Sequence, residues 1–469
     1  MLFTSFEYLI LLVVTFAVYY LLPWRLRIVM ILVASYIFYS YWEPYYAIII
    51  AVTTLVDYFA AMFIDQSDNP RTRKALLWTS VVANLGMLGY FKYTNFALDT
   101  LRPLLAKIGL DTPSINVILP IGISFYTFQE MSYTIDVYRR KYKPTKDLIL
   151  FSTYVSFFPQ LVAGPIERAH GLLEQLKKLQ KFDFNKICSG VGLIFIGLAK
   201  KLIIADRLFF FSLPKFQQPY LYDSFELTVS MFLAAIALYL DFGAYTDIAR
   251  GSARMLGIEL SRNFWFPFAA KNPSEYWQRW HMTLTNWIRD YVFISLGGTR
   301  HRARAKTIFN LLFAMALVGL WHGASWKFVL WGVGMGLALV VYFVLRLTLF
   351  RGKKRAPSKP VAMLGWVVML AYLIPLTTLF FCPDVYTAID YIKGITYADW
   401  ESVMKVPVQL AAIFVIVFFV FQFVAVRIDY MKLWNRLPVP VQSIAFTLLF
   451  YLVLFGSVPT SKKFVYFQF

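Results

Sequence analysis

The chain has 469 residues, of which 59% are hydrophobic, 19% are aromatic and only 15% are charged. A soluble protein cannot cover so much apolar surface with so few polar side chains, so the composition excludes a soluble globular enzyme and indicates a polytopic membrane protein. The net charge of +20 does not indicate a nucleic-acid-binding protein, because the Lys and Arg residues fall in short clusters between apolar stretches.

Apolar stretches of about the 20 residues that a membrane helix needs recur along the whole chain. In chain order they cover residues 8–24, 28–42, 46–64, 75–91, 117–135, 149–164, 187–204, 226–248, 308–322, 326–349, 361–381, 408–426 and 440–457. Because some of them are short, we predict an all-α protein with about 11 to 13 membrane segments, including re-entrant or interfacial helices. Residues 1–469 are expected to form a single integral membrane domain.

The basic clusters predict which loops face the cytoplasm. Those at residues 25–27, 71–74 and 139–146 alternate with the first five stretches so that the N-terminus faces outward. Between residues 146 and 300, three stretches and one amphipathic helix would put the flanking clusters on opposite sides of the membrane. At least one of these segments is therefore expected not to cross, and such a segment is tolerated where its backbone is buried in protein.

The region between residues 146 and 300 also contains the first candidate catalytic residue. Ser274 can cap a helix over residues 275–290 that contains His281. Its apolar face is expected to hold Trp277, Trp280, His281, Leu284 and Ile288, and its polar face Gln278, Arg279, Thr283, Asn286 and Asp290. An interfacial amphipathic helix with tryptophan anchors and one hydrogen-bonded histidine would explain this pattern as well as a functional site does.

A second histidine, His322, lies in an apolar run over residues 308–331, within the sequence Gly319-Leu-Trp-His-Gly323. An ionisable residue inside a membrane segment indicates function by default, although a lone histidine can also be structural and the two glycines a packing face. The chain has only four histidines, and two of them set among tryptophans favour a common catalytic role. An imidazole that apolar walls keep neutral can accept a proton from an attacking group.

Two further patterns leave structure and function open. Asp241 and Asp247 precede two arginines on the same predicted helix, so they either form ion pairs there or contact a substrate. Pro159, Gly164 and Pro165 mark a broken or sharply bent segment, which fits a tunnel mouth or a plain loop.

Several reaction classes lack their sequence signature. Cys188 and Cys382 stand far apart without CxxC spacing, which argues against a disulfide framework and a cysteine-rich metal site. The chain has no Walker motif and no GxSxG elbow. We predict no metal site and no bound cofactor.

Further motifs accompany the two histidine segments. They are Leu119-Pro-Ile-Gly-Ile-Ser-Phe-Tyr-Thr-Phe128, Phe158-Pro-Gln-Leu-Val-Ala-Gly-Pro165, Leu240-Asp-Phe-Gly-Ala-Tyr-Thr-Asp247, Trp287-Ile-Arg-Asp-Tyr291 and Leu296-Gly-Gly298. Together with Trp277-Gln-Arg-Trp-His281 and the His322 segment, they closely resemble the membrane-bound O-acyltransferase family, in particular bacterial alginate O-acetyltransferases and their cell-wall relatives. The resemblance covers most of residues 1–350, whereas residues 351–469 are expected to add C-terminal membrane helices.

The resemblance implies tilted helices around a central tunnel, in which an acyl thioester from the cytosol meets an acceptor from the opposite face. His322 would then be the general base that activates the acceptor hydroxyl, and His281 would orient or polarise the reacting carbonyl. Candidate residues of the tunnel or the donor site are Trp277, Arg279, Trp280, Asn286, Trp321, Asp241, Arg300 and Arg302. Gln278 departs from the family pattern, which often has Arg at this place.

The expected function is transfer of acetyl groups from acetyl-CoA, or another cytosolic thioester, for O-acetylation of an extracytoplasmic polysaccharide such as alginate or peptidoglycan. The resemblance implies a bacterial inner-membrane protein and an extracytoplasmic partner protein that completes the transfer. The lipid bilayer is the other expected partner, and no nucleic acid is. The alternative is a transporter or flippase without transfer chemistry, which would often show two related halves; the sequence shows no such repeat.

Overall fold

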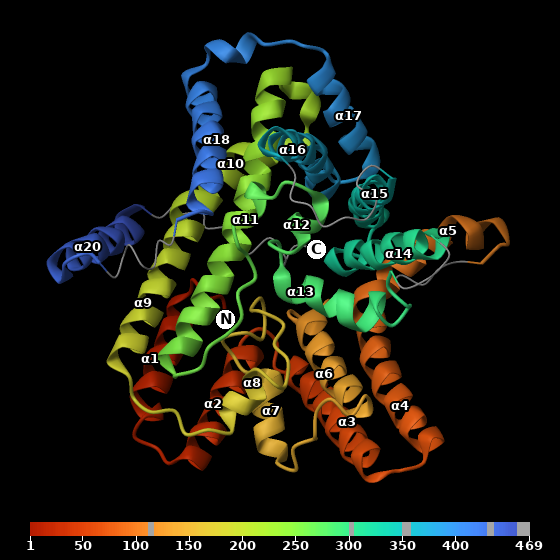
Figure 1. Ribbon diagram of the computed structural model, residues 1–469, viewed down its shortest axis with the longest axis vertical. Helices are drawn as coiled ribbons and strands as arrows, with labels where there is room; N and C mark the ends of the chain where they lie inside the picture. The colour runs from red at the N-terminus through yellow and green to blue at the C-terminus, as the bar shows by residue number, and fades with distance from the viewer. Residues whose placement is uncertain (111–116, 300–303, 349–357, 429–435, 457–469) are drawn as a thin grey trace. The chain divides into compact units, whose positions relative to one another are not determined.

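The computed structural model describes residues 1–110, 117–299, 304–348, 358–428 and 436–456. All regular elements in these residues are helices, as the sequence predicts (Figure 1). The contacts divide the chain into two compact units: unit 1 comprises residues 1–197 and 245–261, and unit 2 comprises residues 198–244 and 262–469. That residues 1–469 form a single domain stays a prediction.

Unit 1 holds the N-terminal helices. They are α1 (Phe6–Tyr19), α2 (Trp24–Ser40), α3 (Tyr46–Gln66), α4 (Pro70–Leu88), the π-helix η1 (Gly89–Tyr93), α5 (Thr94–Lys107), α6 (Ile123–Tyr138), α7 (Leu148–Ser156), α8 (Leu172–Leu176) and α9 (Phe184–Leu198), which ends at the boundary with unit 2. The long helix α11 (Ser224–Met255) belongs to unit 1 from Tyr245 onward and to unit 2 before it.

Unit 2 begins with the π-helix η2 (Ala199–Ala205), α10 (Asp206–Gln217) and η3 (Pro219–Leu221), followed after α11 by η4 (Pro267–Ala269), α12 (Pro273–Trp277), α13 (Met282–Trp287) and the π-helix η5 (Ile288–Phe293). It continues with α14 (Arg304–His322), α15 (Trp326–Thr348), α16 (Lys359–Phe381), α17 (Val385–Thr396), η6 (Glu401–Met404), α18 (Val406–Ala425) and α20 (Val439–Gly456).

The apolar helices make the chain a multi-pass membrane protein. In the described residues, seven helical stretches are long and apolar enough to cross a membrane: α3, the continuous run Phe184–Gln217, α11, α14, α15, α16 and α18. Large apolar side chains remain exposed on them, such as Leu410 and Ile416 of α18, which are 62% and 63% exposed. Such a surface suits lipid and not water.

A buried carboxylate joins three helices of unit 1. Asp57 of α3 is fully buried and accepts hydrogen bonds from the hydroxyl of Ser80 on α4, the Nδ2 of Asn84 on α4 at 2.5 Å and the Oγ1 of Thr134 on α6 at 2.5 Å. A buried charged group is tolerated where it is hydrogen-bonded in this way. The predicted stretch 75–91 thus belongs to a polar contact between helices.

The predicted stretch 149–164 is not a continuous helix. Helix α7 ends at Ser156, and residues 157–165 form a turn-rich segment that is buried throughout. Proline disfavours a helical conformation in the residue before it, which explains why the helix stops just before Pro159. The bend predicted from the prolines is confirmed.

This bent segment returns to the end of unit 1 from which it starts. Asp147, just before α7, forms an ion pair with Arg25, while the neighbouring Trp24 donates through Nε1 to the carbonyl of Leu176 at 2.9 Å. Both ends of the segment therefore lie beside the start of α2. This geometry supports the prediction that one segment of the middle region does not cross the membrane.

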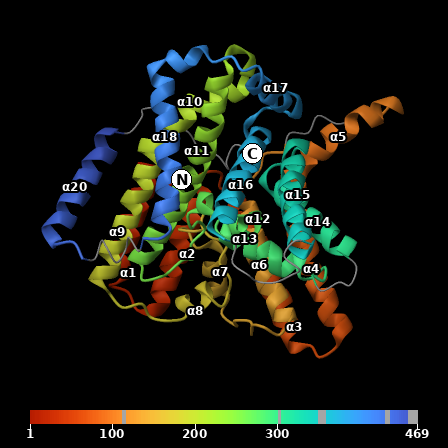
Figure 2. The same ribbon diagram turned by 45° about the horizontal axis from the view of Figure 1, so that its top comes forward.

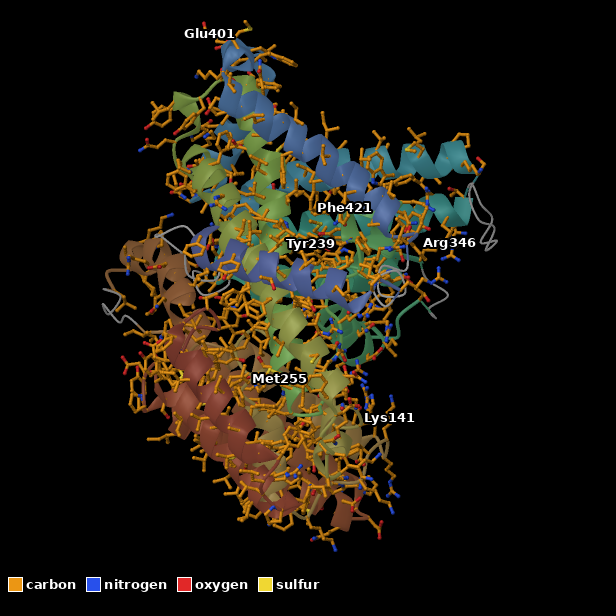
Figure 3. All side chains as sticks on the ribbon, turned by 90° about the vertical axis from the view of Figure 1, so that its left-hand side faces the viewer. Lys141, Tyr239, Met255, Arg346, Glu401 and Phe421 are labelled. Atoms are coloured by element: carbon orange, nitrogen blue, oxygen red, sulfur yellow. The ribbon has the colours of Figure 1, made fainter. Side chains whose placement is uncertain are left out.

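The basic clusters of unit 1 gather at this same end. Arg73 donates to the carbonyl of Tyr138 at 2.8 Å, Arg140 lies 3.8 Å from Asp68, and Arg27 donates to the carbonyl of Gln180 at 2.7 Å. Figure 3 labels Lys141 in the third cluster. The shared end supports the predicted placement of all three clusters on one side of the membrane.

Candidate active site

The helix predicted over residues 275–290 is broken at its centre. Helix α12 ends at Trp277, α13 starts at Met282, and a π-helix follows from Ile288. Between α12 and α13, His281 adopts a left-handed conformation with φ 38° and ψ 55°. The predicted single helix is therefore wrong, because contacts with a distant segment outweigh local helix propensity.

The cap of the first short helix also differs from the prediction. The side chain of Asn272, and not that of Ser274, accepts a hydrogen bond from the backbone N–H of Glu275, at 2.9 Å. Pro273 occupies the first turn, where a missing N–H costs nothing. Asn and Ser are about equally good N-caps, so the choice between them depended on the backbone entering the helix.

His281 is fully buried among aromatic rings. Its ring packs edge-on against Phe242 of α11, with 4.7 Å between centroids, and against Trp321 of α14 at 5.6 Å. Burial lowers the pKa of His281 to about 3, because a charged imidazole would lose its hydration. The imidazole is therefore neutral at physiological pH.

His322 is the last residue of α14 and is only 3% exposed. Its ring lies 5.0 Å from that of Trp331 and 5.5 Å from that of Phe380. The ring of Trp321, its neighbour in the sequence, lies 5.0 Å from that of His322. Since Trp321 also contacts His281, the structure places the imidazole of His281 against the residue next to His322.

Glycines bring the helix that carries His322 close to its neighbour. α14 and α15 lie side by side (Figure 2). A Cβ atom on Gly319 would lie 2.1 Å from the carbonyl oxygen of Phe328, and one on Gly332 would lie 2.3 Å from that of Met315. A Cβ atom on Gly323 would lie 2.1 Å from the ring of Phe328, so the packing face considered for Gly319 and Gly323 is confirmed.

The predicted tryptophans line the surroundings of both histidines. Trp277 packs edge-on against Trp331 at 6.3 Å, and Trp331 in turn contacts His322. Trp280 stacks on Tyr276 at 5.6 Å and meets Phe264 at 5.1 Å. Aromatic packing continues to Tyr239 on α11, which lies 6.2 Å from Phe418 of α18; Figure 3 labels Tyr239 and, further along α18, Phe421.

The charged candidates have other neighbours. Arg279 donates to Glu275 at 2.8 Å and to the carbonyl of Trp265 at 3.2 Å, so its guanidinium supports the local fold. Asn286 lies half-buried on α13. Arg300 and Arg302 lie outside the described residues.

Asp241 takes part in an ion-pair network that the sequence reasoning missed. It lies 2.7 Å from the ammonium of Lys201, which is also 2.8 Å from Asp206, and Lys201 and Asp241 are fully buried. A lysine inside the apolar stretch 187–204 was the available signal. Asp247, in contrast, forms an ion pair within its helix, one of the two alternatives left open by the sequence, 3.7 Å from Arg250.

No group of three or more His, Cys, Asp or Glu side chains in the described part of the chain could hold a metal ion. The chemistry available is that of two buried imidazoles between aromatic walls. A neutral imidazole carries one acceptor nitrogen and one N–H donor. Such a pair can remove a proton from one group and donate a hydrogen bond to another.

Comparisons with known proteins identify the family of the chain. Residues 144–377, which include both histidines, match the membrane-bound O-acyltransferase family. The chain is 36% identical over 387 residues, 79% of its length and 75% of the relative's, to a protein of Azotobacter vinelandii named probable alginate O-acetylase AlgI. It is 37% identical over 386 residues to the protein of the same name from Pseudomonas putida, covering 79% and 77% of the two chains.

A third relative is the peptidoglycan O-acetyltransferase of Helicobacter pylori, which is 30% identical over 391 residues, 78% of this chain and 72% of the relative. The chain therefore belongs to the membrane-bound O-acyltransferase family. It is a membrane O-acyltransferase, as the motifs around His281 and His322 predict.

Proposed function

We propose that the protein transfers acetyl groups from acetyl-CoA, on the cytosolic side, for O-acetylation of an extracytoplasmic polysaccharide. The observation that carries the proposal is that buried His281 contacts Trp321, the residue next to buried His322, inside the family-matched region. The names of the relatives support acetyl as the group and alginate or peptidoglycan as the type of acceptor.

In the proposed reaction, neutral His322 accepts the proton of the acceptor hydroxyl while the hydroxyl oxygen attacks the carbonyl carbon of the thioester. The carbon–sulfur bond then breaks, and the imidazolium returns the proton to the thiolate, so that free CoA and an acetyl ester leave. The aromatic walls favour this cycle because they disfavour a lasting charge on the imidazole. A positioned general base contributes roughly 10² to 10⁴ in rate.

In the same proposed reaction, His281 stabilises the negative charge that develops on the carbonyl oxygen. Its low pKa keeps it neutral, and the N–H of a neutral imidazole can donate to the oxygen on which negative charge develops. Because the ring is buried and packed against Phe242, it does not have to reorganise during the reaction. Preorganised donors of this kind are worth about 10² to 10³ in kcat.

The membrane arrangement is part of the proposal. We expect the protein in a bacterial inner membrane with its N-terminus outward, and with a tunnel between donor and acceptor sides. The total of about 11 to 13 membrane segments would include shorter helices such as α1 and α20. An extracytoplasmic partner protein would complete the transfer, so the immediate acceptor hydroxyl belongs either to that partner or to the polysaccharide. A transporter without transfer chemistry does not fit a member of an acyltransferase family.

The test replaces His322 by Ala in membranes supplied with radiolabelled acetyl-CoA, the partner and the polymer. Acetyl transfer per inserted protein molecule should fall at least about 100-fold. His170→Ala is the matched control, because this histidine lies exposed in a turn, and it should leave transfer unchanged. Near-normal transfer by the His322 variant, at equal membrane abundance, would remove His322 from the base role.

A further inference from the structure

The backbone of His281 is held in a conformation that an ordinary side chain disfavours. Its φ of 38° lies in the left-handed region, where the Cβ atom crowds the backbone. Such a conformation persists only where surrounding contacts enforce it, and it is found preferentially at functional sites. The contacts that enforce it should therefore matter for the chemistry of the imidazole.

On the C-terminal side of His281, the enforcing residue is Asn263. Its backbone carbonyl accepts a hydrogen bond from the N–H of Met282 at 2.9 Å. Its side-chain Oδ1 accepts the hydroxyl of Thr283 at 2.6 Å and, more distantly, the N–H of Thr283 at 3.4 Å. One residue thus fixes the first turn of α13, directly after His281.

On the N-terminal side, the next residues of the same segment act in the same way. The N–H of Trp265 donates to the carbonyl of Arg279 at 3.0 Å, and Arg279 donates back to the carbonyl of Trp265 at 3.2 Å. The chain on both sides of His281 is therefore hydrogen-bonded to the segment 263–265. Phe264, between the two attachment points, lies 6.4 Å from the imidazole.

Asn263 is fully buried, so its amide serves contacts inside the protein and not solvation. A side chain at this place must accept hydrogen bonds from a hydroxyl and an N–H, which an apolar residue of similar size cannot do. Loss of the acceptor would remove the hydrogen bonds that Asn263 Oδ1 accepts from half-buried Thr283 and loosen the turn. The imidazole would then be free to leave its place between Phe242 and Trp321.

We infer that Asn263 is a positioning residue of the acyltransferase reaction, which fixes the left-handed turn at His281 and so aims the imidazole at the reacting carbonyl. The inference rests on the proposed role of His281. A displacement of about 1 Å can cost about 100-fold in rate without any loss of substrate binding. Loss of the positioning role of Asn263 should therefore lower kcat and leave the KM for acetyl-CoA unchanged.

The experiment measures the KM for acetyl-CoA and the kcat, normalised to the amount of inserted protein, for four variants with the polymer acceptor. Asn263→Leu should lower kcat by about 10- to 100-fold and leave the KM for acetyl-CoA within about twofold. Asn263→Asp keeps the acceptor oxygen and should recover most of kcat. Thr283→Val, which has the shape of Thr without its hydroxyl, should lower kcat about 3- to 10-fold, whereas Thr283→Ser should not.

Equal kcat in the Val and Ser variants of Thr283, or a change in KM with kcat retained, would overturn the inference. If the Leu variant of Asn263 fails to accumulate, the Thr283 pair still decides, because Val keeps the shape of Thr without its hydroxyl and Ser keeps the hydroxyl. His281→Ala separates this inference from the proposed function. Normal transfer by His281→Ala would refute the role of His281 itself, whereas impaired transfer combined with normal kcat in Thr283→Val would refute only the role of Asn263.

Discussion

The two units bury their polar side chains in different surroundings. In unit 1, the carboxylate of Asp57 is enclosed by hydroxyl and amide donors from α4 and α6. In unit 2, the rings of His281 and His322 are packed against Phe242, Trp321 and other aromatic residues. A carboxylate surrounded by donors stabilises the fold, whereas aromatic walls leave an imidazole neutral and able to exchange a proton.

Asp57→Leu should destabilise the fold without affecting the chemistry of the site. The change leaves the donors of Ser80, Asn84 and Thr134 without their acceptor, which should cost about 3 to 9 kcal/mol at roughly 1 to 3 kcal/mol for each buried donor. Membrane abundance and Tm in detergent should fall, while the transfer rate of each surviving molecule stays near wild type. Asp57→Asn, which keeps one acceptor oxygen, should lower Tm and membrane abundance less than Asp57→Leu does. Equal decreases in the two variants would contradict the hydrogen-bond argument.

Lys201→Met should show that the buried ion pairs of Lys201 in unit 2 also stabilise the fold. Without its ammonium, Asp206 and Asp241 remain buried as uncompensated carboxylates, and breaking a buried ion pair costs about 3 to 5 kcal/mol. A lower Tm in detergent should follow. Lys178→Met, at an exposed position, is the control, and adding Asp241→Asn to the Lys201 variant should restore part of the Tm; no such recovery would refute the pairing.

Gly332→Ala tests whether the close packing of α15 on α14 supports both stability and acetyl transfer. The new methyl group would meet the carbonyl of Met315 at 2.3 Å, and overpacking of this kind costs about 1 to 3 kcal/mol. We expect a lower Tm together with a lower transfer rate, because α15 carries Trp331 against His322. Gly243→Ala meets nothing within 4 Å and should leave both unchanged; a similar loss in both variants would point to helix flexibility and not to contact.

The smallest expected effect is a pH dependence of stability from His281. Its pKa is lowered from 6.5 to about 3 in the folded protein, so the unfolded chain binds the extra proton first as the pH falls. The stabilisation is therefore fully present above about pH 6.5 and declines from there toward pH 3, by up to about 1.4 kcal/mol per pH unit. Tm measured between pH 7 and pH 5 should fall less in His281→Leu than in wild type; identical slopes would show that His281 is not buried in its neutral form.

Much of the protein followed from the sequence alone. The composition and the apolar stretches determined the all-helical, multi-pass class, because about 20 apolar residues can be accommodated only in a membrane or a large buried core. The motifs around His281 and His322 determined the acyltransferase family. The prolines after Ser156 located the break in α7, since proline acts on its immediate neighbours.

Tertiary structure alone decided the details of the site. The sequence pattern of residues 275–290 favours one helix, yet hydrogen bonds from residues 263–265 interrupt it at His281. The partner of Asp241 is Lys201, 40 residues away in the sequence, and Trp321, the sequence neighbour of His322, contacts His281 only through the tertiary fold. Sequence periodicity reports local preference, whereas these contacts join segments far apart in the chain, and their combined free energy exceeds the small propensity differences that favour a continuous helix.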